Sequence, residues 1–146
     1  MSCSSGIVHV LIAEDNPTDV LIIREALRGR PIKFDVQVVD DGEKAIEFIE
    51  RVEAADTARL DVLLLDLNLP RKTGLEVLER IRKSAKCAPT QVVIFSSSES
   101  PKDRHEAARL GATQYFRKPA NLDEFLKIGD LVVEVAQRAG GRISSS

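Results

Sequence analysis

The sequence predicts an α/β domain in which a five-stranded parallel sheet carries helices on both faces. Three observations lead to this fold class. Five apolar runs alternate with five stretches of helical periodicity along the 146 residues, which is the pattern of strands joined by helical crossovers. Cap residues followed by proline or glycine mark the boundaries between these stretches. Right-handed crossovers in an open sheet favour a doubly wound arrangement with the flavodoxin-like strand order 2-1-3-4-5.

The first two strands and helices follow from apolar patterning and turn residues. Residues 7–13 form a buried apolar run, and Asn16-Pro17 then supplies an N-cap and a proline at the first helical position. Apolar residues at helical spacing continue to Gly29, which ends this helix. Residues 34–39 alternate like a half-buried strand, and the turn at residues 40–42 opens the second helix.

The same alternation continues through the middle of the chain. A polar, alanine-rich connector over residues 52–60 leads to the run 61–65, which is the most clearly buried of the predicted strands. A third helix follows Gly74. The fourth strand covers residues 91–95, and Ser100-Pro101 repeats the signal of a cap followed by proline.

The last strand and helix complete the predicted fold. Residues 113–116 form a short fifth strand. Asn121, with Glu124 three residues later, is typical of a capping box, and the helix that it opens is predicted to reach about Gln137. The tail at residues 139–146 is rich in glycine, arginine and serine, and we expect it to be disordered.

Composition excludes several classes of function. A hydrophobic fraction of 43% and a charged fraction of 30% are ordinary for a globular protein, and a net charge of −2 argues against general nucleic-acid binding. No apolar run could span a bilayer or serve as a signal peptide. Cys3 and Cys87 have no metal-ligand spacing, as expected of reduced thiols. We therefore expect one cytoplasmic domain over residues 1–146, with its core at about 7–138 and no nucleic-acid or membrane partner.

Acidic residues follow two of the predicted strands at one edge of the sheet. Sites in doubly wound sheets lie beyond the carboxyl ends of the strands, where the strand order reverses. Glu14 and Asp15 follow the first strand, and Asp66 ends the third. Carboxylates this close raise one another's pKa unless a cation compensates them, and Mg²⁺ prefers oxygen ligands. We therefore predict a Mg²⁺ site made by these three carboxylates, with the backbone carbonyl of Asn68 as a further ligand.

A hydroxyl and an ammonium are expected at the same edge. Ser96 ends the fourth strand and Lys118 follows the fifth, so both can reach a phosphoryl oxygen. Taken singly, these residues have ordinary roles as a polar loop and a surface lysine, and Tyr115 as a core aromatic. Their joint position, in the order that the fold requires, favours a phosphoryl site.

Four motifs at this edge resemble the receiver domain of two-component response regulators. The resemblance covers about residues 7–137. It implies that Asp66 is the phosphoacceptor and that Glu14 and Asp15 hold Mg²⁺. The motifs are L-I-A-E-D-N at 11–16, L-L-L-D-L-N-L-P at 63–70 with Gly74 after it, V-V-I-F-S at 92–96 and Y-F-R-K-P at 115–119.

The same resemblance assigns the remaining site residues. It makes Ser96 the switch hydroxyl, Tyr115 the switch aromatic and Lys118 the phosphoryl-binding lysine, and it implies a cis peptide bond between Lys118 and Pro119. Serine at position 96 and glutamate at position 14 replace the family's more frequent threonine and aspartate. Both replacements keep the required functional group.

The resemblance implies a single-domain response regulator that takes a phosphoryl group from a histidine kinase or phosphotransfer protein and signals through protein contacts. It is not expected to act as an enzyme on other substrates. Residues 52–60, 65–74 and 118–125 also resemble small receivers paired with phytochrome-type kinases. A degenerate receiver that docks without phosphorylation remains an alternative. An aspartyl-phosphate hydrolase is disfavoured because Asn68 stands where its second aspartate is needed, and an FMN carrier because the acidic residues repel phosphate.

The last helix carries two apolar stripes. Its first stripe is sufficient to cover the sheet. The second stripe, Ile128, Leu131 and Val135, has no obvious partner within one domain, so we predict a homodimer through this face that phosphorylation strengthens or reorients. The alternative is that the second stripe only widens the core-facing surface.

Overall fold

The predicted parallel sheet is present in the computed structural model, which describes residues 6–144 except 57 and 99. The strand order is β2-β1-β3-β4-β5 with every neighbouring pair parallel, which confirms the predicted order. The register aligns the carboxyl ends of the strands at one edge. The strands are β1 (Ile7–Ala13), β2 (Lys33–Val39), β3 (Val62–Asp66), β4 (Gln91–Ser96) and β5 (Gln114–Arg117).

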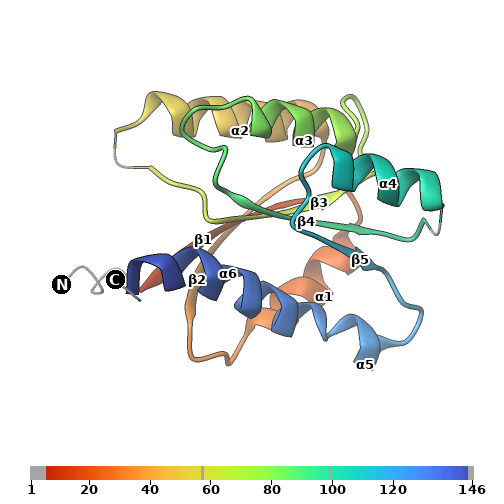
Figure 1. The fold of residues 1–146 in the computed structure, drawn as a ribbon. Helices are drawn as coiled ribbons and strands as arrows, with labels where there is room; N and C mark the ends of the chain where they lie inside the picture. The colour runs from red at the N-terminus through yellow and green to blue at the C-terminus, as the bar shows by residue number, and fades with distance from the viewer. Residues whose placement is uncertain (1–5, 57, 99, 145–146) are drawn as a thin grey trace.

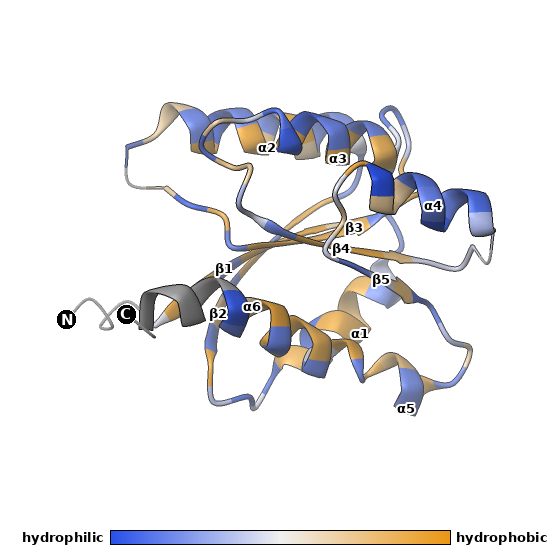
Figure 2. Ribbon diagram, viewed as in Figure 1, coloured by the Kyte–Doolittle hydropathy of each residue, from blue (hydrophilic) through white to orange (hydrophobic). Residues whose placement is uncertain are grey.

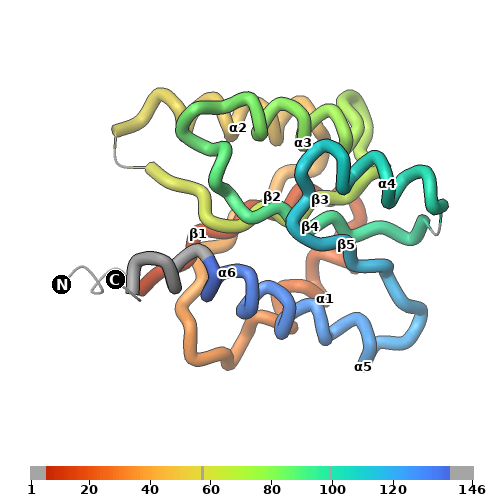
Figure 3. Tube along the Cα trace, in the orientation of Figure 1, coloured from red at the N-terminus to blue at the C-terminus, as the bar shows by residue number. Residues whose placement is uncertain are grey.

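Helices cover both faces of the sheet. In Figure 1, α2, α3 and α4 lie above it, and α1, α5 and α6 lie below it. The trace in Figure 3 shows α2 beside α3 and α1 beside α6, and these two pairs are in contact. Among the described residues, no helix is both long enough and apolar enough to cross a membrane. The helices are α1 (Pro17–Leu27), α2 (Gly42–Ala54), α3 (Gly74–Arg82), α4 (Pro101–Arg109), α5 (Leu122–Phe125) and α6 (Ile128–Ser144).

The core is aliphatic and is divided into two layers by the sheet. Side chains of β3 alternate between them: Leu63 and Leu65 pack toward α2 and α3, whereas Val62 and Leu64 pack toward α1 and α6. All of β3 is buried, as expected for the central strand of a sheet that is covered on both faces. Figure 2 shows the apolar strands in the middle, between helices that mix polar and apolar residues.

Cap residues start the helices where the sequence predicts. Asn16 accepts hydrogen bonds from the backbone N of Thr18 and Asp19, and Pro17 is the first helical residue of α1. Asn121 accepts one from the backbone N of Glu124 at 3.1 Å. These caps satisfy backbone donors that would otherwise lack a partner at the helix start.

The predicted final helix differs from the structure at both ends. It is broken between Phe125 and Ile128, where backbone bonds such as Gly129 N to Leu126 O (3.1 Å) join residues three apart and tighten the chain. It also continues to Ser144 in the structure, past residue 139, where the sequence predicts that a disordered tail begins. Residues 145–146 lie outside the described residues. The predicted connector 52–60 likewise begins as the last turn of α2, which ends at Ala54.

The predicted dimer face on α6 is wrong. Ile128 and Val135 are fully buried, and Leu131 packs partly buried against the same core. The physical reason is that α6 contacts the sheet and α1 together, so both apolar stripes are covered within one domain. A Cβ on Gly129 would lie only 2.4 Å from the backbone oxygen of Ala26 in α1, which shows how closely these two helices approach.

Candidate functional site

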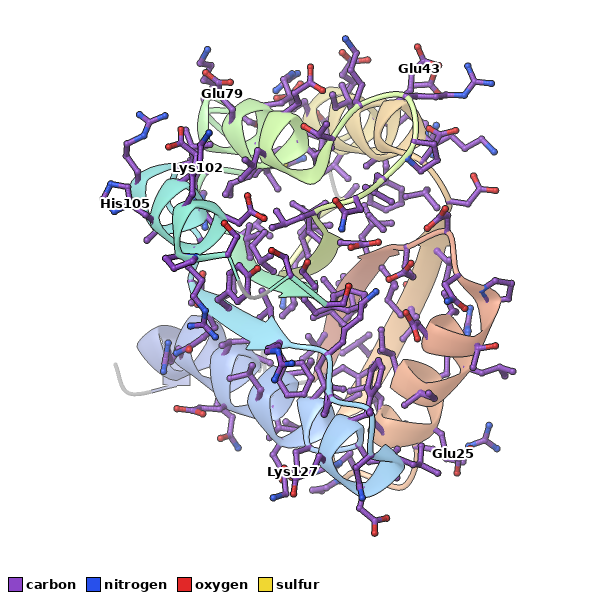
Figure 4. The ribbon with its side chains drawn as sticks, turned by 90° about the vertical axis from the view of Figure 1, so that its right-hand side faces the viewer. Glu25, Glu43, Glu79, Lys102, His105 and Lys127 are labelled. Atoms are coloured by element: carbon purple, nitrogen blue, oxygen red, sulfur yellow. The ribbon has the colours of Figure 1, made fainter. Side chains whose placement is uncertain are left out.

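The carboxyl ends of the strands meet at one edge, which faces the viewer in Figure 4. Charged side chains labelled there, among them Glu25 of α1, Glu43 of α2 and Lys102 of α4, point outward from the surrounding helices. The residues that follow β1, β3, β4 and β5 lie within this ring of helices, at the place where the topology predicts a site.

Three carboxylates form a cluster at the centre of this edge. One oxygen from each of Glu14, Asp15 and Asp66 lies within 4.8 Å of the others. Glu14 and Asp66 are 2% and 4% exposed, whereas Asp15 is exposed. The backbone N of Asn16 donates to Oε2 of Glu14 at 3.0 Å. The backbone N of Asn68 donates to Oδ1 of Asp66 at 3.2 Å. The cluster is therefore a fixed set of hard oxygen ligands with an exposed member.

Lys118 lies beside this cluster, in the loop that follows β5. Its Nζ donates to Oε1 of Glu14 and to Oδ2 of Asp19, both at 2.8 Å. The same atom lies 3.9 Å from Oδ2 of Asp66. It also lies 4.9 Å from the ring centroid of Phe95 in β4, within the range of cation–π attraction. Elements from both ends of the chain thus fix the position of this ammonium.

Burial and neighbouring charges shift the pKa values of two of these groups. Burial raises the pKa of Glu14 from 4.5 to about 7; the hydrogen bond from Lys118 opposes this rise and the charge of Asp66 adds to it. Burial acts to lower the pKa of Lys118, but its hydrogen bonds to Asp19 and Glu14 outweigh that effect and raise the pKa. The carboxylates of Glu14, Asp15, Asp19 and Asp66 outnumber the ammonium of Lys118 at this edge, which favours binding of a cation.

Hydroxyl groups connect β4, α4 and β5 on the other side of the site. Ser96 is fully buried, and its Oγ accepts from the backbone N of Ser98 at 3.1 Å. The hydroxyl of Ser98 donates to Oδ2 of Asp103 at 2.7 Å, and its carbonyl accepts from the Tyr115 hydroxyl at 3.3 Å. The guanidinium of Arg104 lies 4.6 Å from the centroid of the Tyr115 ring. Ser98 therefore links the two residues predicted as the switch pair.

The loop after Asp66 packs tightly against its surroundings. A Cβ on Gly74 would lie 2.4 Å from the backbone oxygen of Asp66. Gly42 donates its backbone N to Pro70 O at 3.1 Å, and a Cβ there would lie 1.9 Å from the backbone oxygen of Lys72. Neither position has room for a side chain, so these glycines fix the path of the loop that follows the predicted acceptor.

The structure brings the predicted residues to one edge, although their chemical roles stay predictions. Asp66 lies with Glu14 and Asp15, and Lys118 contacts this group. The predicted ligand role of the Asn68 carbonyl likewise stays a prediction. One implication of the resemblance is wrong, because the peptide bond before Pro119 is trans.

The sequence reasoning missed Asp19. An acidic residue in the first turn of a helix is an ordinary signal of favourable interaction with the helix dipole, and it attracted no functional interpretation. The available clue was its place in the first turn of the helix that begins directly after Glu14-Asp15.

The chain belongs to the family of the response regulator receiver domain, because the model of that family matches residues 10–129. It is therefore a signal-transduction module of the two-component type. The fold described above is the fold of the solved receiver structures that resemble it.

Three relatives illustrate the similarity. Response regulator Rcp1 of Synechocystis sp. is 30% identical over 120 residues, which are 82% of this chain and 82% of that protein. Transcriptional regulatory protein TrcR of Mycobacterium tuberculosis is 31% identical over 152 residues, but this chain spans only 55% of its length. The phosphorylated cyanobacterial phytochrome response regulator RcpA has a TM-score of 0.80 and 34% identity, over 87% of this chain and 91% of that one. Rcp1 in its Mn²⁺-bound form has a TM-score of 0.78 and 28% identity, over 86% and 91%.

Proposed function

We propose that this protein is a single-domain response regulator that accepts a phosphoryl group on Asp66 from a sensor histidine kinase or a phosphotransfer protein. The position of the Asp66 carboxylate carries the proposal. It lies in the cluster with Glu14 and Asp15, and 3.9 Å from the ammonium of Lys118. A nucleophile beside hard-metal ligands and a fixed cation has the parts that phosphoryl transfer uses.

The carboxylate cluster fits Mg²⁺. Its three oxygen donors lie within 4.8 Å of one another, and oxygen donors of this kind suit a small hard cation that keeps several waters. Glu14, Asp15 and Asp66 would hold the ion together with the Asn68 carbonyl, and when bound it supplies positive charge for the phosphoryl oxygens. The Mn²⁺-bound form of Rcp1 supports a divalent cation in this family.

The chain's own residues contribute a nucleophile and a fixed charge. A carboxylate oxygen of Asp66 attacks the phosphorus of the phosphohistidine, so that a P–O bond forms while the P–N bond breaks. The electron pair of the broken bond returns to the imidazole nitrogen, which takes up a proton from water. Lys118 balances the charge of the transferred group, and the burial of Asp66 limits competing access of water.

Ser96 and Tyr115 are proposed to carry the change to the surface. A phosphoryl group on Asp66 attracts the Ser96 hydroxyl, which gives up the bond that it accepts from Ser98 N. The Tyr115 hydroxyl, held to the Ser98 carbonyl at 3.3 Å, then turns inward. This repacking alters the surface of α4, β5 and the helices that follow, through which the signal passes to another protein.

The comparisons favour a phytochrome-type kinase as the phosphodonor. RcpA is a phytochrome response regulator and matches this chain at 34% identity. The buried free thiol of Cys87 is consistent with a reducing compartment, and we place the protein in the cytoplasm. A homodimer stays a prediction, and the stripe of Ile128, Leu131 and Val135 that motivated it lies in the core.

Acetyl phosphate with Mg²⁺, followed by intact-mass spectrometry, tests the proposal. The wild type should gain one phosphoryl group, while Asp66→Asn and chelator-treated protein should gain none. Asp40→Asn removes an exposed carboxylate that follows β2, and this matched control should label like the wild type. Labelling of Asp66→Asn would contradict the assignment. A folded wild type that is never labelled, by acetyl phosphate or by a cognate kinase, would favour the docking-only receiver.

A further inference from the structure

The ammonium of Lys118 is bonded to carboxylates other than the proposed phosphoacceptor. Two of its three donors are used at 2.8 Å, one on Glu14 and one on Asp19. The distance to Asp66 is 3.9 Å, beyond hydrogen-bonding range. The bonds to Glu14 and Asp19 therefore hold the ammonium out of contact with Asp66, and a shift of the ammonium toward a phosphoryl group there would stretch them.

Its two partners differ in how they relate to the carboxylate cluster. Glu14 belongs to the cluster, so a bound cation competes with Lys118 for the same carboxylate. Asp19 is not a member of it, and its backbone N is fixed to the N-cap Asn16 at 3.3 Å. The Asp19 side chain is only 16% exposed, which protects its ion pair from screening by salt. A cation bound by the cluster therefore has no direct claim on the carboxylate of Asp19 that holds Lys118.

We propose that Asp19 is a positioning residue that competes with the phosphoryl group for Lys118, and thereby weakens binding of a phosphoryl group at Asp66. The inference rests on the function proposed above. Each hydrogen bond that Lys118 makes to the phosphoryl oxygens draws its ammonium away from Asp19. Because the bond that is stretched is short, charge-assisted and mostly buried, the competition carries a measurable free-energy cost.

Beryllofluoride, a non-covalent mimic of the phosphoryl group, measures this competition directly. With Mg²⁺ present, its affinity for wild type and for Asp19→Asn can be compared by isothermal titration calorimetry. Asparagine keeps the shape and an acceptor oxygen but removes the charge that holds Lys118. We expect Asp19→Asn to bind beryllofluoride about threefold to tenfold more tightly than the wild type, the effect of weakening one charge-assisted hydrogen bond.

A matched control removes the same charge from the same helix at a distance from Lys118. Glu25 lies on α1, its side chain is 63% exposed, and it pairs with Arg28. Figure 4 shows Glu25 pointing away from the molecule. Glu25→Gln should leave the affinity for beryllofluoride unchanged, which separates a local effect on Lys118 from a general effect of net charge.

A double-mutant cycle shows whether Asp19 acts through Lys118. In a Lys118→Met background, Asp19→Asn should change the affinity by less than about twofold, because the contested ammonium is gone. Lys118→Gln, which keeps a donor for the two carboxylates, replaces Lys118→Met if that variant does not fold. If Asp19→Asn still raises the affinity for beryllofluoride in the Lys118→Met background, Asp19 repels the ligand directly. This result would overturn the inference.

The remaining outcomes separate this inference from the proposed function. Equal affinity of wild type and Asp19→Asn would overturn the competition alone. Weaker binding by Asp19→Asn would do so too, since Asp19 would then hold Lys118 in its productive place. A wild type that binds no beryllofluoride, or an Asp66→Ala variant that binds it equally well, would instead refute the phosphoacceptor site itself.

Discussion

The proposed phosphoryl site has two sides that hold their polar groups in different ways. We call them the β1 side, with Glu14, Asp19 and Lys118, and the β4 side, with Ser96, Ser98 and Tyr115. On the β1 side, Lys118 bonds to Glu14 and Asp19 at 2.8 Å, and none of these three side chains is more than 16% exposed. On the β4 side, the Tyr115 hydroxyl reaches the Ser98 carbonyl at 3.3 Å, and both residues are partly exposed. Short charge-assisted bonds are about twice as strong as neutral ones. The β4 side should therefore rearrange at a lower free-energy cost than the β1 side, which suits a binding site joined to a switch.

The largest expected effect follows from removing the ammonium of Lys118 on the β1 side. Lys118→Met leaves Glu14 and Asp19 buried without their partner, and we expect a loss of about 3–5 kcal/mol in the free energy of unfolding at about pH 8 without Mg²⁺. Urea denaturation measures this loss. Lys44→Met breaks an exposed ion pair with Asp40 and should change the free energy of unfolding far less, because water screens an exposed pair. Similar losses in both variants would show that burial adds nothing to the ion pairs of the β1 side.

An intermediate effect is expected from pH, again on the β1 side. Folding raises the pKa of Glu14 from 4.5 to about 7, so between these values the folded protein keeps a proton that the unfolded chain releases. The bound proton of Glu14 therefore adds roughly 3 kcal/mol to the free energy of unfolding. This contribution is complete below about pH 4.5 and is lost as the pH rises through about 7. Metal-free protein unfolded in urea at a series of pH values should show this decline.

Glu14→Gln is the control for the pH dependence. It removes the titrating group, so the decline in stability between about pH 4.5 and 7 should flatten. Mg²⁺ affinity of the wild type should rise across the same interval, because the ion competes with the proton on Glu14. If the stability of Glu14→Gln declines with pH as much as that of the wild type, the decline arises from a titrating group other than Glu14.

The smallest effect is expected on the β4 side. Tyr115→Phe removes only the hydroxyl that contacts Ser98 and keeps the ring beneath the guanidinium of Arg104. We expect a loss of about 0.5–1 kcal/mol in the free energy of unfolding and unchanged labelling by acetyl phosphate. A loss as large as that of Lys118→Met would mean that the two sides are equally rigid, and the proposed division between binding and switching would fail.

The sheet and the position of the site were predictable because their signals are local. The run that became β3 is apolar throughout, and Asn16-Pro17 starts α1 at the expected residue. Once the strand order is known, the shared edge of parallel strands places Glu14, Asp66 and Lys118 together. Neither step requires knowledge of side-chain partners.

Partners between elements could not be predicted from the sequence. The bond between Asp19 and Lys118 depends on how α1 lies against the loop after β5, which no local pattern encodes. The prediction of a dimer face on α6 was wrong for the same reason. A helical pattern shows which residues are apolar, but it does not show that α6 packs against the sheet and α1 together. The break before Ile128 was hidden because the apolar spacing continues through it.

Sequence separation within the site has a consequence for protein synthesis. Lys118 lies 104 residues from Glu14 and 99 residues from Asp19 along the chain. Closing loops of this length carries an entropic cost, and long-range contacts of this kind form slowly. A nascent or proteolysed chain that ends before β5 contains the carboxylate of Asp66, the proposed acceptor, but not the ammonium of Lys118. If the proposed function holds, we expect a phosphodonor kinase to discriminate against unfinished chains without any separate surveillance step, since only a completed fold assembles all the groups proposed to receive the phosphoryl group.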